Sequence, residues 1–225
     1  MPAKNSIKLD IEETYYHVYN RGVDKRVIFE DEQDYKVFLN YLREYLSPPK
    51  PLSELEVEVT LKGSTFKGIP RLLNNYFDQI HLLAYCLMPN HFHLLIKQKD
   101  IGMMKNFMRS LGTRYSVYFN KRYERSGSLF QGIYKAVIIS NENYLLHLSR
   151  YIHLNPAELR IELDDAYSSY GDYTGLRNTT WIESETIKSY FSKENNKITS
   201  YKSFVESMID KKDNELIQGY TLDLP

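Results

Sequence analysis

Apolar positions alternate in some stretches of the chain and recur at helical spacing in others. Alternation or a short apolar run predicts a strand, and recurrence every three to four residues predicts a helix. Four strands are predicted, at residues 14–20, 79–87, 91–98 and 133–139. Three helices are predicted, at residues 31–46, 102–123 and 141–154. This order, with a central hairpin, favours an α+β fold in which an antiparallel sheet carries helices on one face.

Two stretches lie outside this core pattern. Residues 47–78 are interpreted as an insertion, in which LEVEVTLKG alternates like a strand and Pro70 is expected to open a short helix through Tyr76. After residue 160 the chain becomes polar and acidic, with short helical patterns near residues 183–191 and 200–210. We therefore expect a core domain over 1–160 and a mostly helical C-terminal extension over 161–225 that packs on it.

Charge is distributed unevenly, although the 29 basic and 29 acidic side chains of the 225 residues cancel. Residues 97–135 hold 9 Lys and Arg against 2 Asp and Glu, a net charge of +7. The preceding segment has 11 against 13, or −2, and the following segment has 9 against 14, or −5. A concentrated basic segment favours nucleic-acid binding, although a solvated helix face would explain it equally well.

Composition also restricts the compartment. Cys86 is the only cysteine, which excludes an internal disulfide and suits a reducing compartment. The chain contains no run of about 18 apolar residues, and its first residues contain no apolar stretch of signal-peptide length. We therefore expect a cytoplasmic protein that does not enter a membrane.

A histidine pair is the first candidate for chemistry. His91 and His93 lie at i and i+2 of a predicted strand and therefore point to the same face. Their Cα atoms should be about 6.5–7 Å apart, so that both imidazoles can reach one divalent ion at about 2.1 Å. Phe92 and Leu94 point to the opposite face and into the core. The pattern alone is frequent by chance and does not establish a metal site.

A tyrosine and an asparagine form the second candidate. Tyr151 and Asn155 are four residues apart on the last predicted helix and share a face. A phenol and a carboxamide placed there could supply a nucleophile and an oxygen ligand, or they could simply pack. Because Pro156 disfavours a helical conformation at the residue before it, Asn155 is expected in a final half-turn. His147, one turn before Tyr151, either assists proton removal or is an ordinary helix residue.

Several motifs in order resemble the single-tyrosine HUH transposases, and most closely their REP-associated, insertion-sequence-like branch. The main motifs are AYCLMPNHFHLLIK (84–97), RSGSLFQGIYKA (125–136) and SRYIHLNPAELR (149–160). YHVYNRGVDKRVIF (16–29) resembles that family's first strand and turn. YSSYGDYTG (167–175) and YKSFVESM (201–208) resemble its C-terminal part. The likeness runs from about Thr14 to Met208, apart from the insertion.

The resemblance implies a ferredoxin-like antiparallel sheet and a defined set of site residues. It places the family's two histidine ligands on His91 and His93, its catalytic tyrosine on Tyr151 and its third, polar ligand on Asn155. It implies a metal-dependent single-strand DNA endonuclease and strand transferase that uses Mg²⁺ or Mn²⁺ and forms a 5′-phosphotyrosine on hairpin-flanked DNA. A possible homodimer and a nucleoid-associated location belong to the same expectation.

The implied DNA substrate gives the basic segment a use. Cations can contact phosphates, and aromatic side chains can stack on the bases of a single strand, although sheet packing would also account for the aromatics. The predicted DNA contacts are Arg21, Lys25, Arg26, Lys97, Lys105, Arg109, Arg114, Lys121, Arg122, Arg125, Phe130, Tyr134 and Lys135. We treat His17 and His81 as structural.

Three functions remain open from the sequence. The first is an active nuclease and strand transferase, which the presence of all four site residue types favours. The second is a domesticated relative that binds repeated DNA hairpins without transposing. The third is a replication initiator or relaxase, against which the short length and the lack of a helicase segment argue. Whether Tyr151 acts in its own subunit or in a partner's also stays open.

Overall fold

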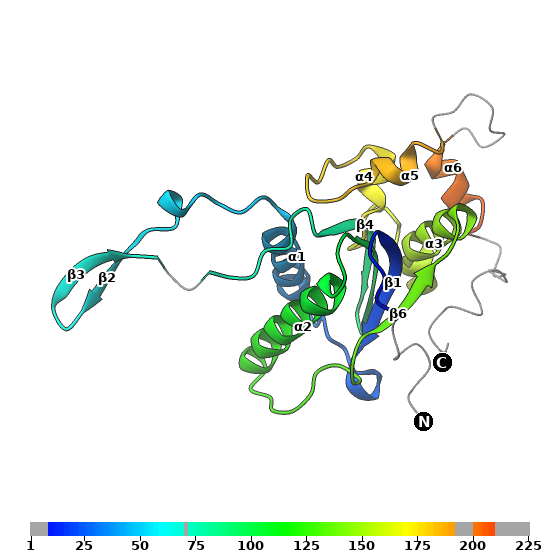
Figure 1. The fold of residues 1–225 in the computed structure, drawn as a ribbon. Coiled ribbons are helices and arrows are strands. Elements are labelled where there is room, and N and C mark those ends of the chain that lie inside the picture. The colour runs from blue at the N-terminus through cyan, green and yellow to red at the C-terminus, as the bar shows by residue number, and fades with distance from the viewer. Residues whose placement is uncertain (1–8, 70–71, 192–199, 210–225) are drawn as a thin grey trace.

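The computed structural model describes residues 9–69, 72–191 and 200–209, whose centre is a four-stranded antiparallel sheet (Figure 1). The strands are β1 (Thr14–Arg21), β4 (Ile80–Met88), β5 (His91–Gln98) and β6 (Lys135–Ile139), in the order β4-β5-β1-β6. β1 is central and pairs antiparallel with β5 and β6. Without the insertion, this is the ferredoxin-like order, so the predicted α+β class with an antiparallel sheet is confirmed.

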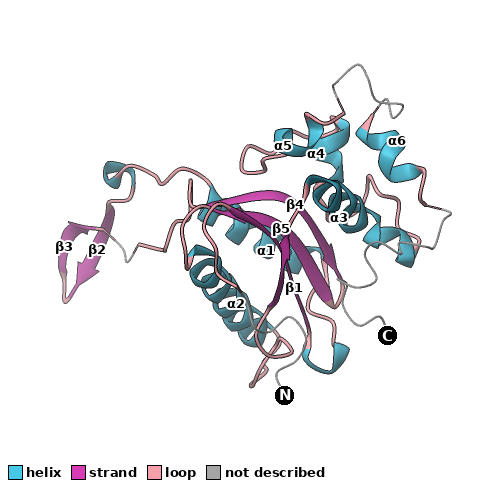
Figure 2. Ribbon diagram, turned by 45° about the vertical axis from the view of Figure 1, so that its right-hand side comes forward, coloured by secondary structure: helices cyan, strands magenta, loops and turns pink. Residues whose placement is uncertain are grey.

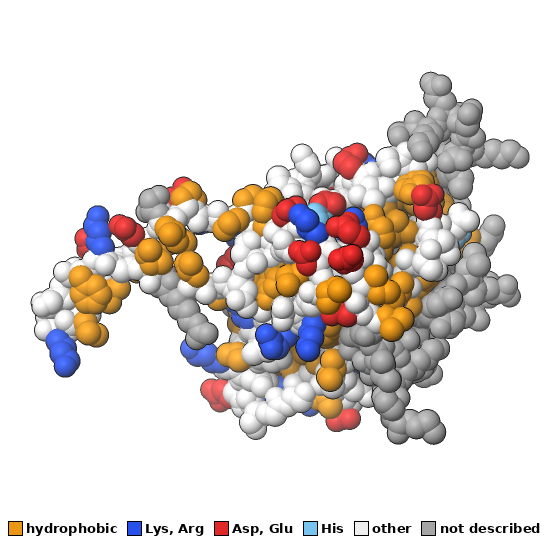
Figure 3. All heavy atoms as spheres, viewed as in Figure 1, with side chains coloured by type: hydrophobic (Ala, Val, Ile, Leu, Met, Phe, Trp, Pro, Cys, Tyr) orange, Lys and Arg blue, Asp and Glu red, His pale blue; other side chains and the backbone are white. Residues whose placement is uncertain are grey.

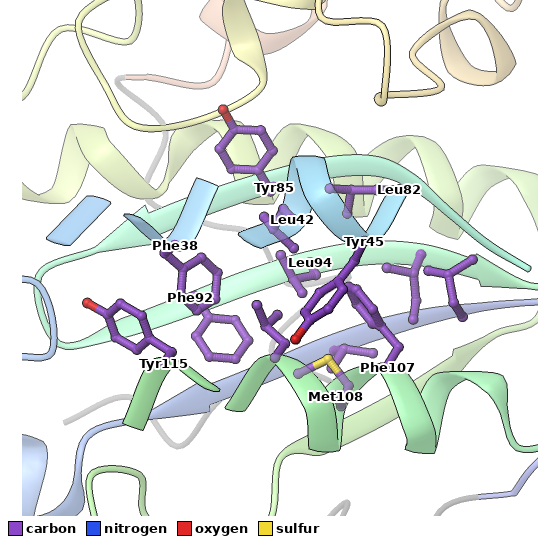
Figure 4. Packing of buried hydrophobic residues seen from close by; sticks show 14 of the residues in the cluster. Phe38, Leu42, Tyr45, Leu82, Tyr85, Phe92, Leu94, Phe107, Met108 and Tyr115 are labelled. Carbon is purple, nitrogen blue, oxygen red and sulfur yellow. The ribbon is translucent and has the colours of Figure 1, made fainter. Parts of the chain in front are cut away.

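Helices α1 (Glu32–Leu46) and α2 (Met103–Arg122) cover one face of the sheet. Helix α1 begins after Asp31, whose carboxylate accepts hydrogen bonds from the main-chain N–H groups of Gln33 and Asp34. Apolar side chains of both helices pack against β4 and β5 (Figure 4). These labelled side chains are Phe38, Leu42, Tyr45, Phe107, Met108 and Tyr115 from the helices and Leu82, Tyr85, Phe92 and Leu94 from the strands. The hydrophobic core fills this layer.

Helix α3 (Glu142–Leu154) packs on the opposite face, so the sheet has helices on both sides (Figure 2). This layering differs from the expected arrangement on one face. The reason is that the central strands are apolar on both faces: Leu95 packs with Leu148 and Ile152 of α3 in a second core cluster. A strand covered on both faces has a nearly continuous apolar run, and β4 is of this kind.

The insertion forms an arm that extends away from the sheet (Figure 1). It contains a short 3-10 helix, η2 (Leu52–Glu54), and a separate two-stranded sheet of β2 (Val57–Leu61) and β3 (Ser64–Gly68). Apolar side chains are exposed along the arm (Figure 3), among them Leu61 at 61% and Phe66 at 49%.

The helix expected between Pro70 and Tyr76 is wrong for its described part, because residues 72–76 are not helical. Tyr76 is buried, its main-chain N–H donates to the carbonyl of Tyr45 at 2.8 Å, and its hydroxyl donates to the carbonyl of Asn106 at 2.9 Å. These tertiary contacts hold the returning chain in a non-helical form. Pro70 lies outside the described residues.

The C-terminal extension packs on the outer side of α3. Its helices are α4 (Tyr170–Thr174), α5 (Glu185–Lys188) and α6 (Tyr201–Glu206), so the two predicted helical patterns are confirmed as shorter helices, with residue 210 outside the described part. The buried ring of His153 on α3 is hydrogen-bonded to Tyr201 and to Ser169, both at 2.7 Å. The domain boundary at residue 160 stays a prediction. Within the described residues, every helix falls short of the length and apolar character needed to cross a bilayer.

Candidate active site

The two histidines of β5 lie on the face of the sheet that α3 covers. Their neighbours Phe92 and Leu94 point the other way into the core and are almost fully buried. The imidazole centroids of His91 and His93 are 5.0 Å apart, with the ring planes nearly perpendicular at 84°. The strand alternation therefore places the two rings side by side, as predicted.

His93 is completely buried, and its two ring nitrogens differ. Nδ1 lies 2.8 Å from Nε2 of His17 on β1. Nε2 is buried without a hydrogen-bond partner in the described part of the chain. Burial holds the pKa of His93 well below its usual value, and the neighbouring His17 and His91 lower it further. A neutral imidazole with an unused buried nitrogen fits a metal ligand.

Helix α3 brings Tyr151 and Asn155 to the same place. The phenol ring of Tyr151 lies edge-on to the ring of His93 of the same chain, 5.5 Å between centroids. The side chain of Asn155, 3% exposed, is hydrogen-bonded to His91 and to the Tyr151 side chain. Its Nδ2 donates to the main-chain carbonyl of Tyr151 at 2.8 Å, which leaves Oδ1 as the donor atom for a cation.

The end of α3 positions Asn155. Regular helix ends at Leu154, and Asn155 opens a 3-10 turn, η3 (Asn155–Leu159). Its dihedral angles are φ −50° and ψ −42°, so the residue before Pro156 remains in the helical region despite the expected disfavour. The predicted half-turn is therefore present. At Asn155 the hydrogen-bond pattern changes from α-helical to 3-10, while the dihedral angles stay helical.

The phenol of Tyr151 is protonated at neutral pH. Burial raises its pKa, and the nearby Glu158 carboxylate raises it further, while the hydrogen bond from Asn155 acts in the opposite direction. Deprotonation of the phenol therefore has to be coupled to the reaction. His147 faces the C-terminal extension: it bonds to Arg150 at 2.7 Å, and its ring lies 5.9 Å from that of Phe204.

The donor set is consistent with a divalent ion. Two imidazole nitrogens, from His91 and His93, and one carboxamide oxygen, from Asn155, converge at this face. Imidazole and carbonyl oxygen together accept several divalent metals without strong preference. No cluster of three or more His, Cys, Asp and Glu occurs in the described ranges; here the third donor is an asparagine.

Two predicted cations lie near this centre. Arg21 is the register partner of His91, and its charge contributes to a lowered pKa of His91, behind the larger effect of burial. The ammonium of Lys135 lies 6.0 Å from the ring centroid of Tyr19, which is 5.9 Å from the ring of His93. A phosphate at the site would therefore meet positive charge from β1 and β6.

Four other predicted contacts line a groove of about 540 Å³ on the opposite face of the sheet, between α2 and the loop that follows it: Lys105, Arg109, Phe130 and Tyr134. The groove is also lined by Gly112 in the middle of α2. Phe130 is only 8% exposed and packs against Phe92, so it follows the packing alternative rather than base stacking.

Several predicted cations are engaged within the chain. Arg122 pairs with Asp31 and with the fully buried Asp34 at 2.7 Å. Arg114 pairs with Glu44 at 2.6 Å. Lys97 pairs with Glu13, and Arg125 bonds to Asn120. Lys25 and Lys121 are exposed and Arg26 is half-buried. The structure thus provides intramolecular partners for Arg114 and Arg122, whose charges are largely neutralised.

The comparisons with known proteins concern this same region. The family model described as "Transposase IS200 like" matches residues 67–155, which contain His91, His93, Tyr151 and Asn155. The matched segment is similar to the IS200-like transposase family over 67–155 alone, less than half of the chain. No curated protein matches the chain.

The chain also resembles two solved structures. A REP-associated tyrosine transposase bound to a REP hairpin is 12% identical, with 75% of this chain and 84% of that chain covered and a TM-score of 0.50. This likeness supports the fold. A candidate transposase from Deinococcus radiodurans R1 is 14% identical, with 68% of this chain and 95% of that chain covered and a TM-score of 0.36.

One residue at the candidate site was missed from the sequence. His17, treated as structural, contacts the ring of His93, and Tyr19 lies beside both rings. Alternation along β1 shows that His17 and Tyr19 share a face. Only the pairing of β1 with β5, two segments about 75 residues apart, brings that face to the histidine pair.

Proposed function

We propose that the protein is a single-strand DNA endonuclease and strand transferase of the HUH type, with Tyr151 as nucleophile. The observation that carries this proposal is the convergence of His91, His93, Asn155 and the Tyr151 ring on one face of the sheet. The IS200-like family match supports a DNA-processing enzyme, and the resemblance to single-tyrosine transposases supports the specific chemistry.

In this proposal His91, His93 and Asn155 hold Mg²⁺ or Mn²⁺. The ion supplies Lewis acidity at the scissile phosphate. The Tyr151 oxygen attacks phosphorus, and the bond to the 3′-oxygen breaks. The phenol proton is lost and the leaving 3′-oxygen gains a proton, which gives a 5′-phosphotyrosine and a free 3′-hydroxyl. Because the phosphodiester energy is conserved in the tyrosine linkage, attack by another 3′-hydroxyl can join strands without ATP.

The cations divide into two proposed contact regions. Arg21 and Lys135 lie beside the site, where they can hold the reacting phosphate. Lys105, Arg109 and Tyr134 line the groove on the other face, where a hairpin or single strand can bind. Of the other predicted cations, Lys97, Arg114 and Arg122 are held in ion pairs within the chain. The rest extend the positive surface: Lys25, Arg26, Lys121 and Arg125. We infer a cytoplasmic, nucleoid-associated protein whose own-chain Tyr151 serves its own site, whether or not it forms a homodimer.

The test uses single-stranded hairpin oligonucleotides labelled at the 3′ end, with Mg²⁺ or Mn²⁺. The fragment joined to Tyr151 keeps this label, so a shifted band on a denaturing gel reports the covalent adduct. Tyr151→Phe is expected to abolish the adduct with nearly unchanged DNA affinity, because only the attacking oxygen is lost. A wild-type level of adduct from this variant would remove Tyr151 from the mechanism.

His91→Ala is expected to lose metal-supported cleavage, since one of three donors is removed. Undiminished cleavage with Mn²⁺ would refute its role as a ligand. If the wild type binds hairpin DNA but forms no adduct with either metal, the alternative of a domesticated hairpin-binding protein is the correct one.

A further inference from the structure

The contact between His17 and His93 lies in the buried interior beside the proposed metal site. His17 Nε2 and His93 Nδ1 are 2.8 Å apart, and both side chains are 0% exposed. The ring planes are only 24° from parallel and the centroids are 5.0 Å apart, so the two nitrogens meet edge to edge. Tyr19 lies against the ring of His17 at 4.9 Å between centroids. The geometry is therefore held by neighbouring side chains of β1 and β5.

The arrangement of protons in this pair decides whether His93 can bind a metal. In a neutral imidazole one nitrogen carries the proton and the other offers a lone pair. Nε2 of His93 and Nδ1 of His17 are both buried without a partner in the described residues, and Nε2 of His93 offers its lone pair only if its own Nδ1 carries the proton. That proton must then be donated to Nε2 of His17. The opposite arrangement puts the proton on Nε2 of His93 and blocks coordination.

We propose that His17 is a positioning residue, which accepts the Nδ1 proton of His93 and so fixes the tautomer and ring orientation in which His93 is a ligand. Metal-bound histidines usually donate their second nitrogen to a carboxylate or a carbonyl. Here a neutral imidazole takes that place, which avoids burying a further charge. This inference rests on the proposed function for the identity of the metal site.

Three substitutions separate positioning from space filling. In His17→Gln the amide stands near the position of Nε2 and can still accept the proton. In His17→Asn the shorter amide stands near the position of Nδ1 and cannot reach His93. In His17→Leu the site is filled with no acceptor. A matched control is His153→Gln, which alters another fully buried histidine on the far side of α3.

The first measurement is Mn²⁺ affinity by calorimetry on the full chain without DNA, after circular dichroism has shown that each variant is folded. His17→Leu and His17→Asn are expected to weaken binding about 10- to 100-fold, the usual effect of removing a ligand's outer partner. His17→Gln should restore most of the affinity, and His153→Gln should leave it unchanged. Wild-type affinity in His17→Leu, or equal losses in the Gln and Leu variants, would overturn the proposal.

The second measurement is independent of metal binding and of DNA chemistry. Long-range ¹H–¹⁵N spectra of the metal-free wild type report which nitrogen of each histidine carries the proton. We expect His93 to be protonated at Nδ1 and His17 at Nδ1. A His93 proton on Nε2 would overturn the proposal. Absence of a DNA adduct from a wild type that binds Mn²⁺ through this pair would count against the proposed function alone.

Discussion

Three of the six histidines, His17, His93 and His153, are completely buried. Burial lowers the pKa of His17 and of His153 to about 3. Each therefore folds as a neutral ring that is used for its hydrogen-bonding nitrogens rather than for charge. Because each ring gains a proton when the chain unfolds, the free energy of unfolding begins to fall at a higher pH than the one at which carboxylates titrate.

This sensitivity can be tested at His153. Between an unfolded pKa of about 6.5 and the folded value near 3, the unfolded chain binds a proton that the folded chain does not, so stability falls as pH falls through this window. One such histidine contributes a slope of about 1.4 kcal/mol per pH unit. In His153→Gln, whose amide can keep part of the hydrogen bonding, we expect this contribution to disappear.

Urea unfolding of the wild type and the variant from pH 7.5 to pH 4.5 measures the effect. The difference in unfolding free energy between the wild type and His153→Gln should narrow steadily below about pH 6, because only the wild type loses the His153 contribution. Parallel curves across the whole range would show that His153 does not titrate on unfolding as described.

Most of the candidate site could be predicted residue by residue. His91 and His93 come from the strand period, and Tyr151 and Asn155 from the helix period, so both pairs were on one face before any fold was known. Their convergence came from resemblance to a family rather than from spacing. His17 was missed because its role depends on which strands pair, and local alternation carries no information about strand partners.

At the scale of elements, periodicity predicted β5 at 91–98 with its observed bounds, and predicted α1 and α2 to within one residue at each end. It failed where tertiary contacts decide conformation, as in the non-helical segment held by Tyr76. Periodicity also did not predict that helices cover both faces of the sheet. A buried strand's apolar run does not show which helix lies on which face.

Helix α2 contains an unusual element, a glycine in its middle. Gly112 costs about 0.5–1 kcal/mol relative to alanine at such a position. A Cβ added there would meet nothing within 4 Å, so packing does not require glycine. Since Gly112 lines the groove that holds Lys105 and Arg109, it keeps the floor of that groove open.

We therefore expect Gly112→Leu to weaken hairpin DNA binding about tenfold or more, because loss of contact with a single base costs about 1–3 kcal/mol. Gly112→Ala is the matched control, and should stabilise the fold by about 0.4–1 kcal/mol with a smaller effect on affinity. Fluorescence anisotropy and thermal unfolding measure both effects. DNA affinity unchanged in the Leu variant would exclude the groove from the binding surface.

At the scale of the whole molecule, helix α3 lies between the sheet and the C-terminal extension. Its inner side carries Tyr151, and its outer side carries His153, which bonds to Tyr201 and Ser169. The hydroxyl of Tyr201 also donates to Ser149 at 3.1 Å. The extension thus fixes the helix on which the proposed nucleophile stands, although it contributes no proposed ligand.

Tyr201→Phe removes this hydroxyl and leaves buried polar groups of His153 and Ser149 with one partner fewer. We expect a loss of about 1–3 kcal/mol in the free energy of unfolding, the cost of an unsatisfied buried group. Chemical denaturation measures it, with Tyr41→Phe on α1, a half-buried tyrosine away from the extension, as the comparison. Equal midpoints for the two variants would show that the Tyr201 contacts do not stabilise the fold.

The packing of the C-terminal extension on the outer side of α3 limits which fragment of the chain can be moved into another protein. The family-matched stretch 67–155 holds every proposed ligand and the phenol, yet it omits the central strand β1 and all of the outer cover. If this stretch were expressed alone, β5 would lose its hydrogen-bonding partner β1, and the outer side of α3 would be exposed to solvent. The smallest fragment that we expect to fold with the candidate site intact therefore begins before Thr14 and continues past Glu206.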